Sequence, residues 1–153
     1  MPTLADYRMR VLNTLKSTNA KFEDEVVDEA IRRVIDEYSQ ASPDIDSLSF
    51  PLQQGGSAQP LTGCLSLLAV QQLILPYQPT ELDELAPVRE DFYIFFRQAL
   101  PYAYFTGLPL PQAGQLLFVR YARRHTLTGL DGATLTTLRS EHASMLVVGA
   151  AGA

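Results

Sequence analysis

The feature that most constrains the fold is the segment 22–41, whose apolar residues repeat with the spacing of an α-helix. Its first turn is acidic, which suits the positive end of a helix dipole, and Pro43 requires the helix to have ended before it. Because the apolar positions form one stripe, we expect this helix to bury one face in a core. The stripe consists of Phe22, Val26, Val27, Ala30, Ile31, Val34, Ile35 and Tyr38.

A shorter amphipathic helix is predicted before this segment, over about 4–17. Thr3 can cap it, and Asp6 stands at the third helical position, which makes a carboxylate variant of the capping box. The short turn that follows leads directly into the segment 22–41. The N-terminal part is therefore predicted to hold two helices in succession.

A third, short helix is predicted over about 138–149, after a Leu-Asp-Gly turn. Either Thr136 or Thr137 can cap it. Gly149 and Gly152 then fall in a tail of small residues, which has no bulky side chain to bury and can pack closely against another backbone.

The middle of the chain, about 61–127, is rich in β-branched and aromatic residues and predicts strands. One strand is expected over 70–75, ended by Pro76, and two or three more are expected later in the region. A Pro-Leu-Pro-Gln-Ala-Gly run among these predicts a hairpin-like turn and an antiparallel arrangement. The segment 43–60 is rich in Pro, Gly, Ser and Gln, and we expect an extended segment and a flexible loop there.

Together these patterns predict an α+β fold in a single domain, 1–153. It would combine a small helical bundle, made of two long N-terminal helices and a short C-terminal helix, with an antiparallel β-structured part of three to four strands. A chain of 153 residues buries roughly 70% of the surface that its unfolded form exposes. We therefore expect it to fold without a cofactor.

The net charge of −5 argues against a protein that binds nucleic acid through clustered Lys and Arg. Passage of DNA without adhesion is compatible with it. The densest basic group is Arg120, Arg123 and Arg124. The start lacks a long apolar segment and no apolar run reaches about 18 residues, so we expect a soluble, unprocessed protein with no membrane partner.

Candidate catalytic residues are few. The single cysteine, Cys64, lies in an apolar stretch that is typical of a buried thiol. It could in principle act as a nucleophile with His125 or His142, and a small cysteine hydrolase is the distant alternative that this leaves open. The common nucleotide, zinc and hydrolase motifs are absent. We expect no catalytic residue, no metal site and no cofactor.

Aromatic residues are the other candidate for function, as a binding surface. At strand and helix spacing such residues are more often core. Those between Phe92 and Phe105 are, however, too many for one buried face, which favours a protein interface. The set comprises Tyr7, Tyr38, Phe92, Phe95, Phe96, Tyr102, Tyr104 and Phe105.

The C-terminal quarter, RYARRHTLTGLDGATLTTLRSEHASMLVVGAAGA, resembles the end of the head–tail adaptor (connector) proteins of tailed bacteriophages. The resemblance lies in a strand ending Tyr-x-x-x-His, a Gly-Leu-Asp-Gly-Ala turn, a Thr-Thr pair and a helix ending Gly-Ala-Ala-Gly. In this chain these are Tyr121 and His125, Gly129 to Ala133, Thr136 with Thr137, and Gly149 to Gly152.

The resemblance implies a non-enzymatic virion structural protein. Such adaptors form a ring, commonly of twelve subunits, below the portal protein; the ring extends the DNA channel and offers a platform to the next neck or tail-completion protein. The implied partners are copies of the chain itself, the portal and that downstream protein, with DNA passing through the lumen. The implied location is the head–tail junction of the virion, after assembly in the host cytoplasm. A different neck or tail-completion protein is the alternative.

Residues of the C-terminal quarter are the expected portal or inter-subunit interface. The apolar run 145–148 covers more of a helix circumference than one core face requires, which points to a second contact. The expected interface residues are Arg123, Arg124, His125, Thr136, Thr137, Met145, Leu146, Val148, Gly149 and Gly152.

Overall fold

The computed structural model describes residues 2–15, 23–79 and 86–152. The α+β class is confirmed. Residue contacts divide the chain into two compact units, and the prediction of one domain over 1–153 stays a prediction. A helical unit comprises 1–44 and 124–153, and a β unit comprises 45–123.

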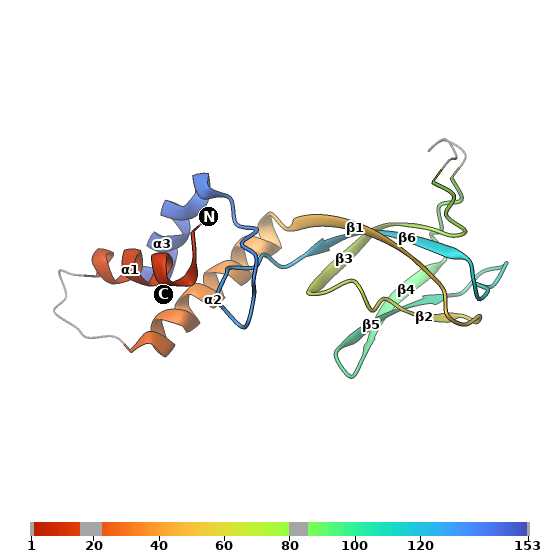
Figure 1. Cartoon of the computed structure of the whole chain (residues 1–153), viewed down its shortest axis with the longest axis horizontal. Coiled ribbons are helices and arrows are strands. Elements are labelled where there is room, and N and C mark those ends of the chain that lie inside the picture. The colour runs from red at the N-terminus through yellow and green to blue at the C-terminus, as the bar shows by residue number, and fades with distance from the viewer. Residues whose placement is uncertain (1, 16–22, 80–85, 153) are drawn as a thin grey trace. The chain divides into compact units, whose positions relative to one another are not determined.

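Three α-helices lie in the described part of the helical unit (Figure 1): α1 (Leu4–Thr14), α2 (Asp24–Ala41) and α3 (Ala143–Gly152). A single 3-10 turn, Ser140–His142, precedes α3. The capping box of α1 is confirmed: the backbone N–H of Thr3 donates to Asp6 Oδ2 at 2.7 Å, and that of Asp6 donates to Thr3 Oγ1 at 3.4 Å. The predicted end of the first helix at 17 and the predicted start of the second at 22 lie outside the described residues.

The core of the helical unit is built from one face of each helix and from leucines of the loop before α3. The predicted stripe of α2 is buried at Val27, Ile31, Ile35 and Tyr38, whereas Val26 is 54% exposed. The other buried side chains are Leu4, Tyr7 and Val11 of α1, Leu127, Leu130 and Leu138 of the loop, and Ala143, Leu146, Val147 and Ala150 of α3.

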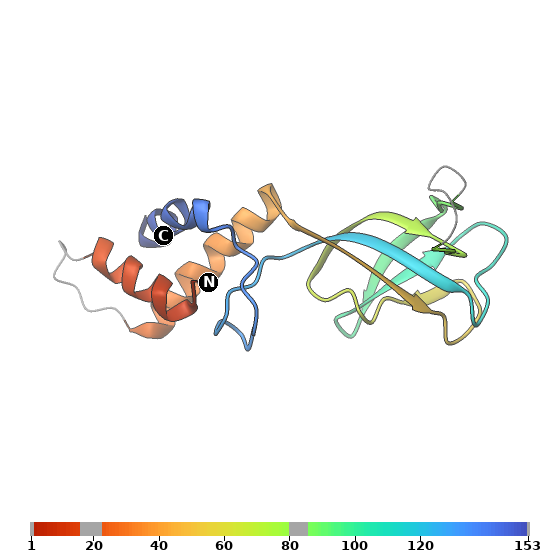
Figure 2. The same cartoon turned by 45° about the horizontal axis from the view of Figure 1, so that its top comes forward.

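The β unit contains six strands in its described residues, so the prediction of three to four is wrong (Figure 2). One sheet has the order β1-β6-β3 and the other β2-β5-β4. The strands are β1 (Asp44–Pro51), β2 (Ala58–Pro60), β3 (Leu67–Ile74), β4 (Phe92–Arg97), β5 (Leu100–Phe105) and β6 (Leu116–Arg123).

The core of the β unit lies between the two sheets. Alternate residues of β6 point inward, and Leu117, Val119 and Tyr121 are buried while Arg120 is exposed. From the other sheet, Ala103 and Phe105 of β5 are buried in the same cluster. Each sheet therefore has one face in the core and one outer face.

Strand β1 lies where the sequence predicted an extended segment and a flexible loop. Leu48 and Phe50 pack against the core, whereas Ser47 and Ser49 are exposed, as expected for a strand with one buried face. Most of the Pro, Gly and Gln residues that suggested a loop come after this alternating part. The prediction used the composition of the whole segment 43–60, and the alternation that marks the strand was therefore missed.

The predicted hairpin across Pro-Leu-Pro-Gln-Ala-Gly is also wrong, because that run connects β5 and β6, which belong to different sheets. The tight hairpin joins β4 to β5 through Gln98 and Ala99, whose φ angles are +52° and +63°. Two-residue hairpin turns of this kind require positive φ at both positions, which Asn-Gly or Asp-Gly normally supply. Gln-Ala carries no such signal, so the sequence did not reveal this turn.

No α-helix in the described ranges is long and apolar enough to cross a membrane.

Candidate functional site

His125 is buried and joins three segments of the helical unit. Its backbone N–H donates to Ser39 Oγ at 2.9 Å, and its Nε2 lies 2.8 Å from the carbonyl oxygen of Ser42. Its Nδ1 lies 3.0 Å from Thr137 Oγ1. Because a carbonyl oxygen only accepts, the Nε2 atom that faces Ser42 carries a proton. The backbone N–H and both ring nitrogens of this predicted interface residue therefore have hydrogen-bond partners inside the helical unit.

Tyr38 of α2 lies against both histidines. Its ring centroid is 4.9 Å from that of His125 and 5.5 Å from that of His142. Its hydroxyl is 2.6 Å from His142 Nδ1. The two imidazoles therefore belong to the helical unit, where they flank one tyrosine.

The threonine pair does not cap the last helix, contrary to the sequence prediction. Thr137 Oγ1 accepts from the backbone N–H of Thr126 at 2.9 Å, and Thr136 Oγ1 accepts from that of Thr128 at 3.0 Å. The 3-10 turn before α3 starts after Arg139 without a side-chain cap. The hydroxyls instead hold the two sides of the loop 126–137 together, beside a backbone bond from the N–H of Thr137 to the carbonyl oxygen of Thr126 at 3.0 Å.

The Gly-Leu-Asp-Gly-Ala turn is attached to α2 by an ion pair. Asp131 adopts a φ of +52°, and its carboxylate accepts from Arg32 Nε and Nη2 at 3.0 and 2.8 Å. The guanidinium lowers the pKa of Asp131 below its ordinary value. Gly129 has a φ of +95°, and a Cβ there would lie 3.3 Å from Leu4. A side chain at position 129 would be strained by the positive φ and would crowd Leu4, which explains why a glycine stands there.

Helix α3 is apolar on two opposite faces. Ala143, Leu146, Val147 and Ala150 are buried in the core of the helical unit. On the other side, Met145 and Val148 are 59% and 63% exposed. Gly149 and Gly152 are exposed as well, and Gly149 lies at the border with α2, where a Cβ would be 3.4 Å from Val34. The predicted small-residue tail is therefore part of the helix, which extends to Gly152 rather than ending at 149. We call Met145, Val148, Gly149 and Gly152 the outward face of α3.

The ten expected interface residues thus fall into different environments. The outward face of α3 holds four of them, whereas His125, Thr136 and Leu146 are buried and Thr137 is half-buried. Arg123 forms an ion pair with Asp46 at 3.0 Å, and Arg124 forms one with Asp36. The structure therefore gathers only Met145, Val148, Gly149 and Gly152 on one exposed surface.

The outer face of the β2-β5-β4 sheet carries paired aromatic rings. Tyr93 stacks on Tyr104 with centroids 5.1 Å apart, and Phe95 stacks on Tyr102 at 5.2 Å. Tyr93 is 53% exposed. On the opposite face Phe105 is buried in the core. The aromatics of this region therefore exceed one buried face, as the sequence indicated.

Cys64 is buried in the β unit, and burial raises the pKa of its thiol to about 11. The thiol is therefore protonated at neutral pH, and a protonated, buried thiol is a poor nucleophile. The cysteine hydrolase alternative has no support in this arrangement. Among the described residues, no cluster of three or more His, Cys, Asp or Glu side chains could hold a metal ion.

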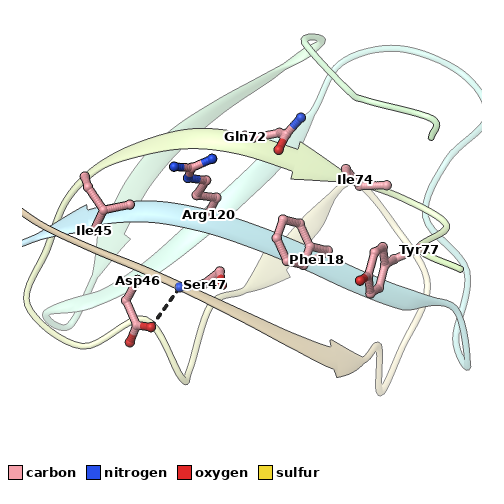
Figure 3. A pocket seen from close by; sticks show the side chains of 8 residues that line it. All are labelled: Ile45, Asp46, Ser47, Gln72, Ile74, Tyr77, Phe118 and Arg120. Carbon is pink, nitrogen blue, oxygen red and sulfur yellow. Dashed lines mark hydrogen bonds between the residues drawn. The ribbon is translucent and has the colours of Figure 1, made fainter. Parts of the chain in front are cut away.

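A feature that the sequence did not indicate is a cavity of about 460 Å³ on the outer face of the β1-β6-β3 sheet. Figure 3 shows the side chains that line it; Phe118 and Arg120 extend from β6. Its other lining residues come from β1, β3 and the segment just after β3. Strands far apart in the sequence supply it, so no local motif could have found it.

The chain has a distant likeness to a solved structure. No protein-family model matches the chain, and no curated protein matches it. A solved structure described as "Neck of empty GTA particle computed with C6 symmetry" has 16% sequence identity and a TM-score of 0.41, covering 99% of this chain and 76% of that chain. A likeness at this identity and score identifies neither the fold nor the role of this chain.

Proposed function

We propose that this protein is a structural protein of a tailed-phage virion, a head–tail adaptor that assembles as a ring, with twelve copies expected, below the portal. In this role it extends the DNA channel and joins the capsid to the neck or tail. Its partners are copies of itself, the portal protein and the next neck protein.

The observation that carries the proposal is the outward face of α3. Apart from the exposed Ser144, α3 is apolar all round, which is typical of a helix covered on all sides; among the described residues, however, its own chain covers one face only. At 10 residues it is about 15 Å long, half the thickness of a bilayer core. Another protein surface is the remaining cover for Met145 and Val148, and an assembly protein supplies one.

The identity of the assembly rests on the resemblance of the C-terminal quarter to head–tail adaptors. The outward face of α3 ends in the Gly-Ala-Ala-Gly step of that resemblance. Gly152 has open space where a Cβ would stand and leaves room for a neighbouring backbone to approach, whereas the missing Cβ of Gly149 lies beside Val34 of α2. The net charge of −5 per copy supports the same role, because a ring of acidic subunits does not hold the phosphates of passing DNA.

The decisive experiment mixes the purified chain with purified portal rings of the phage that encodes it and images the mixture by electron microscopy. We expect an added ring-shaped layer on one end of the portal. Absence of that layer at low and high salt would overturn the adaptor role. Binding to a tail-completion protein without binding to the portal would also overturn it, because it places the protein elsewhere in the neck.

The interface is tested with Val148→Asp and with a matched control, Leu135→Asp. Val148 and Leu135 are 63% and 59% exposed, and both belong to the helical unit. Both variants should keep the circular dichroism spectrum of the parent protein, because neither side chain is in the core. Only Val148→Asp should abolish the ring layer. Rings formed equally well by both variants would show that the outward face of α3 is not the interface.

A further inference from the structure

The cavity on the outer face of the β1-β6-β3 sheet contains a cation without a carboxylate partner among the described residues, Arg120. Two other arginines of the β unit are paired, Arg123 with Asp46 at 3.0 Å and Arg89 with Asp91 at 2.6 Å, whereas Arg97 of β4 is exposed on the other sheet. Since the charge of Asp46 is balanced by Arg123, the cavity keeps the positive charge of Arg120.

Hydrogen-bonding groups surround this cation. Gln72 of β3 stands directly opposite Arg120 in the strand register, and Ser47 of β1 lines the other side. The backbone N–H of Ser47 donates to Asp46 Oδ1 at 2.8 Å, as Figure 3 shows, and the exposed side chain of Ser47 carries a separate hydroxyl that can bond to a ligand. A guanidinium with an amide and a hydroxyl beside it suits a carboxylate, which can accept two parallel bonds from arginine.

The rest of the cavity is apolar and lies along the same strand. Phe118 is two residues before Arg120 on β6, so the two side chains share a face about 6.6 Å apart. The ring of Phe118 lies 4.9 Å from that of Tyr77, and Ile74 is its register partner on β3. An apolar side chain of a ligand would be covered here.

We propose that this face binds an extended, acidic segment of a partner protein, with a carboxylate on Arg120 and an apolar side chain two residues away against Phe118 and Tyr77. The spacing follows from strand geometry, because residues i and i+2 of an extended peptide project on one side with the same 6.6 Å repeat. Nucleic acid fits less well, since one unpaired arginine beside an aspartate does not make a phosphate track. The site is separate from the outward face of α3.

The test is a nuclear magnetic resonance titration of the free, ¹⁵N-labelled chain with the peptide acetyl-Ser-Glu-Ser-Leu-Ser-amide. We expect saturable shifts at residues 45–47, 72–77 and 118–120. Replacing Glu by Gln in the peptide, or Arg120 by Gln in the protein, should each weaken binding about tenfold by removing the charge-assisted hydrogen bonds. Arg97→Gln, which changes an exposed arginine on the other sheet, should bind like the parent protein.

Three outcomes would overturn the proposal: no saturable shift up to about 10 mM peptide, equal affinity for the Glu and Gln peptides, or an Arg120→Gln variant that binds unchanged. Stronger shifts of the same residues by a short DNA duplex would assign the face to nucleic acid instead. Because the titration uses the free chain, its result does not depend on ring assembly. A failed titration would leave the adaptor role standing, and a failed portal experiment would leave this site standing.

Discussion

Thr136 donates a hydrogen bond from its hydroxyl to the carbonyl oxygen of Pro2 at 2.9 Å, across 134 positions of sequence. The same hydroxyl oxygen accepts from the backbone N–H of Thr128 at 3.0 Å. The backbone N–H of Leu4 in turn donates to the carbonyl oxygen of Thr128 at 2.9 Å. The buried threonine thus ties the loop before α3 to the start of α1.

Thr136→Val should lower the free energy of unfolding by about 1–3 kcal/mol, because valine keeps the shape but leaves buried backbone groups without partners. Urea denaturation followed by circular dichroism measures the change. The control is Thr134→Val in the same loop, where the side chain is exposed and the change should stay within about 0.5 kcal/mol. Equal effects of the two substitutions would contradict the assigned role of Thr136.

The two faces of α3 should respond differently to truncation. Leu146→Ala removes a core side chain and should cost about 2–5 kcal/mol of unfolding free energy. Val148→Ala removes an exposed one and should change it by no more than about 0.5 kcal/mol. Thermal and urea unfolding of the isolated chain measure both. A larger loss for Val148→Ala would place the outward face in the protomer core.

Cys64 should react slowly with Ellman's reagent in the native protein. With a pKa of about 11 in place of the ordinary 9.0, its thiolate at pH 8 is about a hundredfold scarcer than in the unfolded chain. Burial of the side chain should slow the reaction further. The absorbance of the released thiolate, recorded with and without urea, tests this. Labelling at the same rate in both conditions would contradict a buried, protonated thiol.

Asp91 should make the β unit more stable above about pH 4 than at pH 2. Its hydrogen bonds with Arg89, at 2.7 and 2.6 Å, lower the pKa of the carboxyl to about 2 from its ordinary 3.8. The pKa of Asp91 is therefore lower in the native state than in the unfolded state. Its contribution to the free energy of unfolding is complete above the unfolded pKa and is lost as the pH falls through the native pKa.

Asp91→Asn should therefore reduce stability at pH 6 and make little difference near pH 2, as measured by urea unfolding across that range. Glu90→Gln, at an exposed neighbouring position, is the matched control. An Asp91→Asn variant that loses the same stability at pH 2 as at pH 6 would show that the ion pair contributes nothing that depends on its charge.

Local patterns in the sequence determined the helices and most strands. The capping box of Thr3 and Asp6 is set by residues three positions apart, and the stripe of α2 by the helical repeat, so both were predictable. The strand predicted over 70–75 overlaps β3, which spans Leu67–Ile74, for the same reason, because alternation and Pro76 are local signals.

Tertiary structure alone decided which strands share a sheet and which hydroxyls bond to which backbone groups. Thr136 and Thr137 have the chemistry of helix caps, but their hydroxyl oxygens accept from the backbone N–H groups of Thr128 and Thr126 instead. Tertiary structure also decided which residues form the candidate sites. Sequence indicated that 145–148 is apolar all round, yet only packing against α1 and α2 separated buried Leu146 from exposed Val148. The cavity around Arg120 exists because β1, β3 and β6 meet in one sheet, and that pairing depends on contacts between residues distant in the chain.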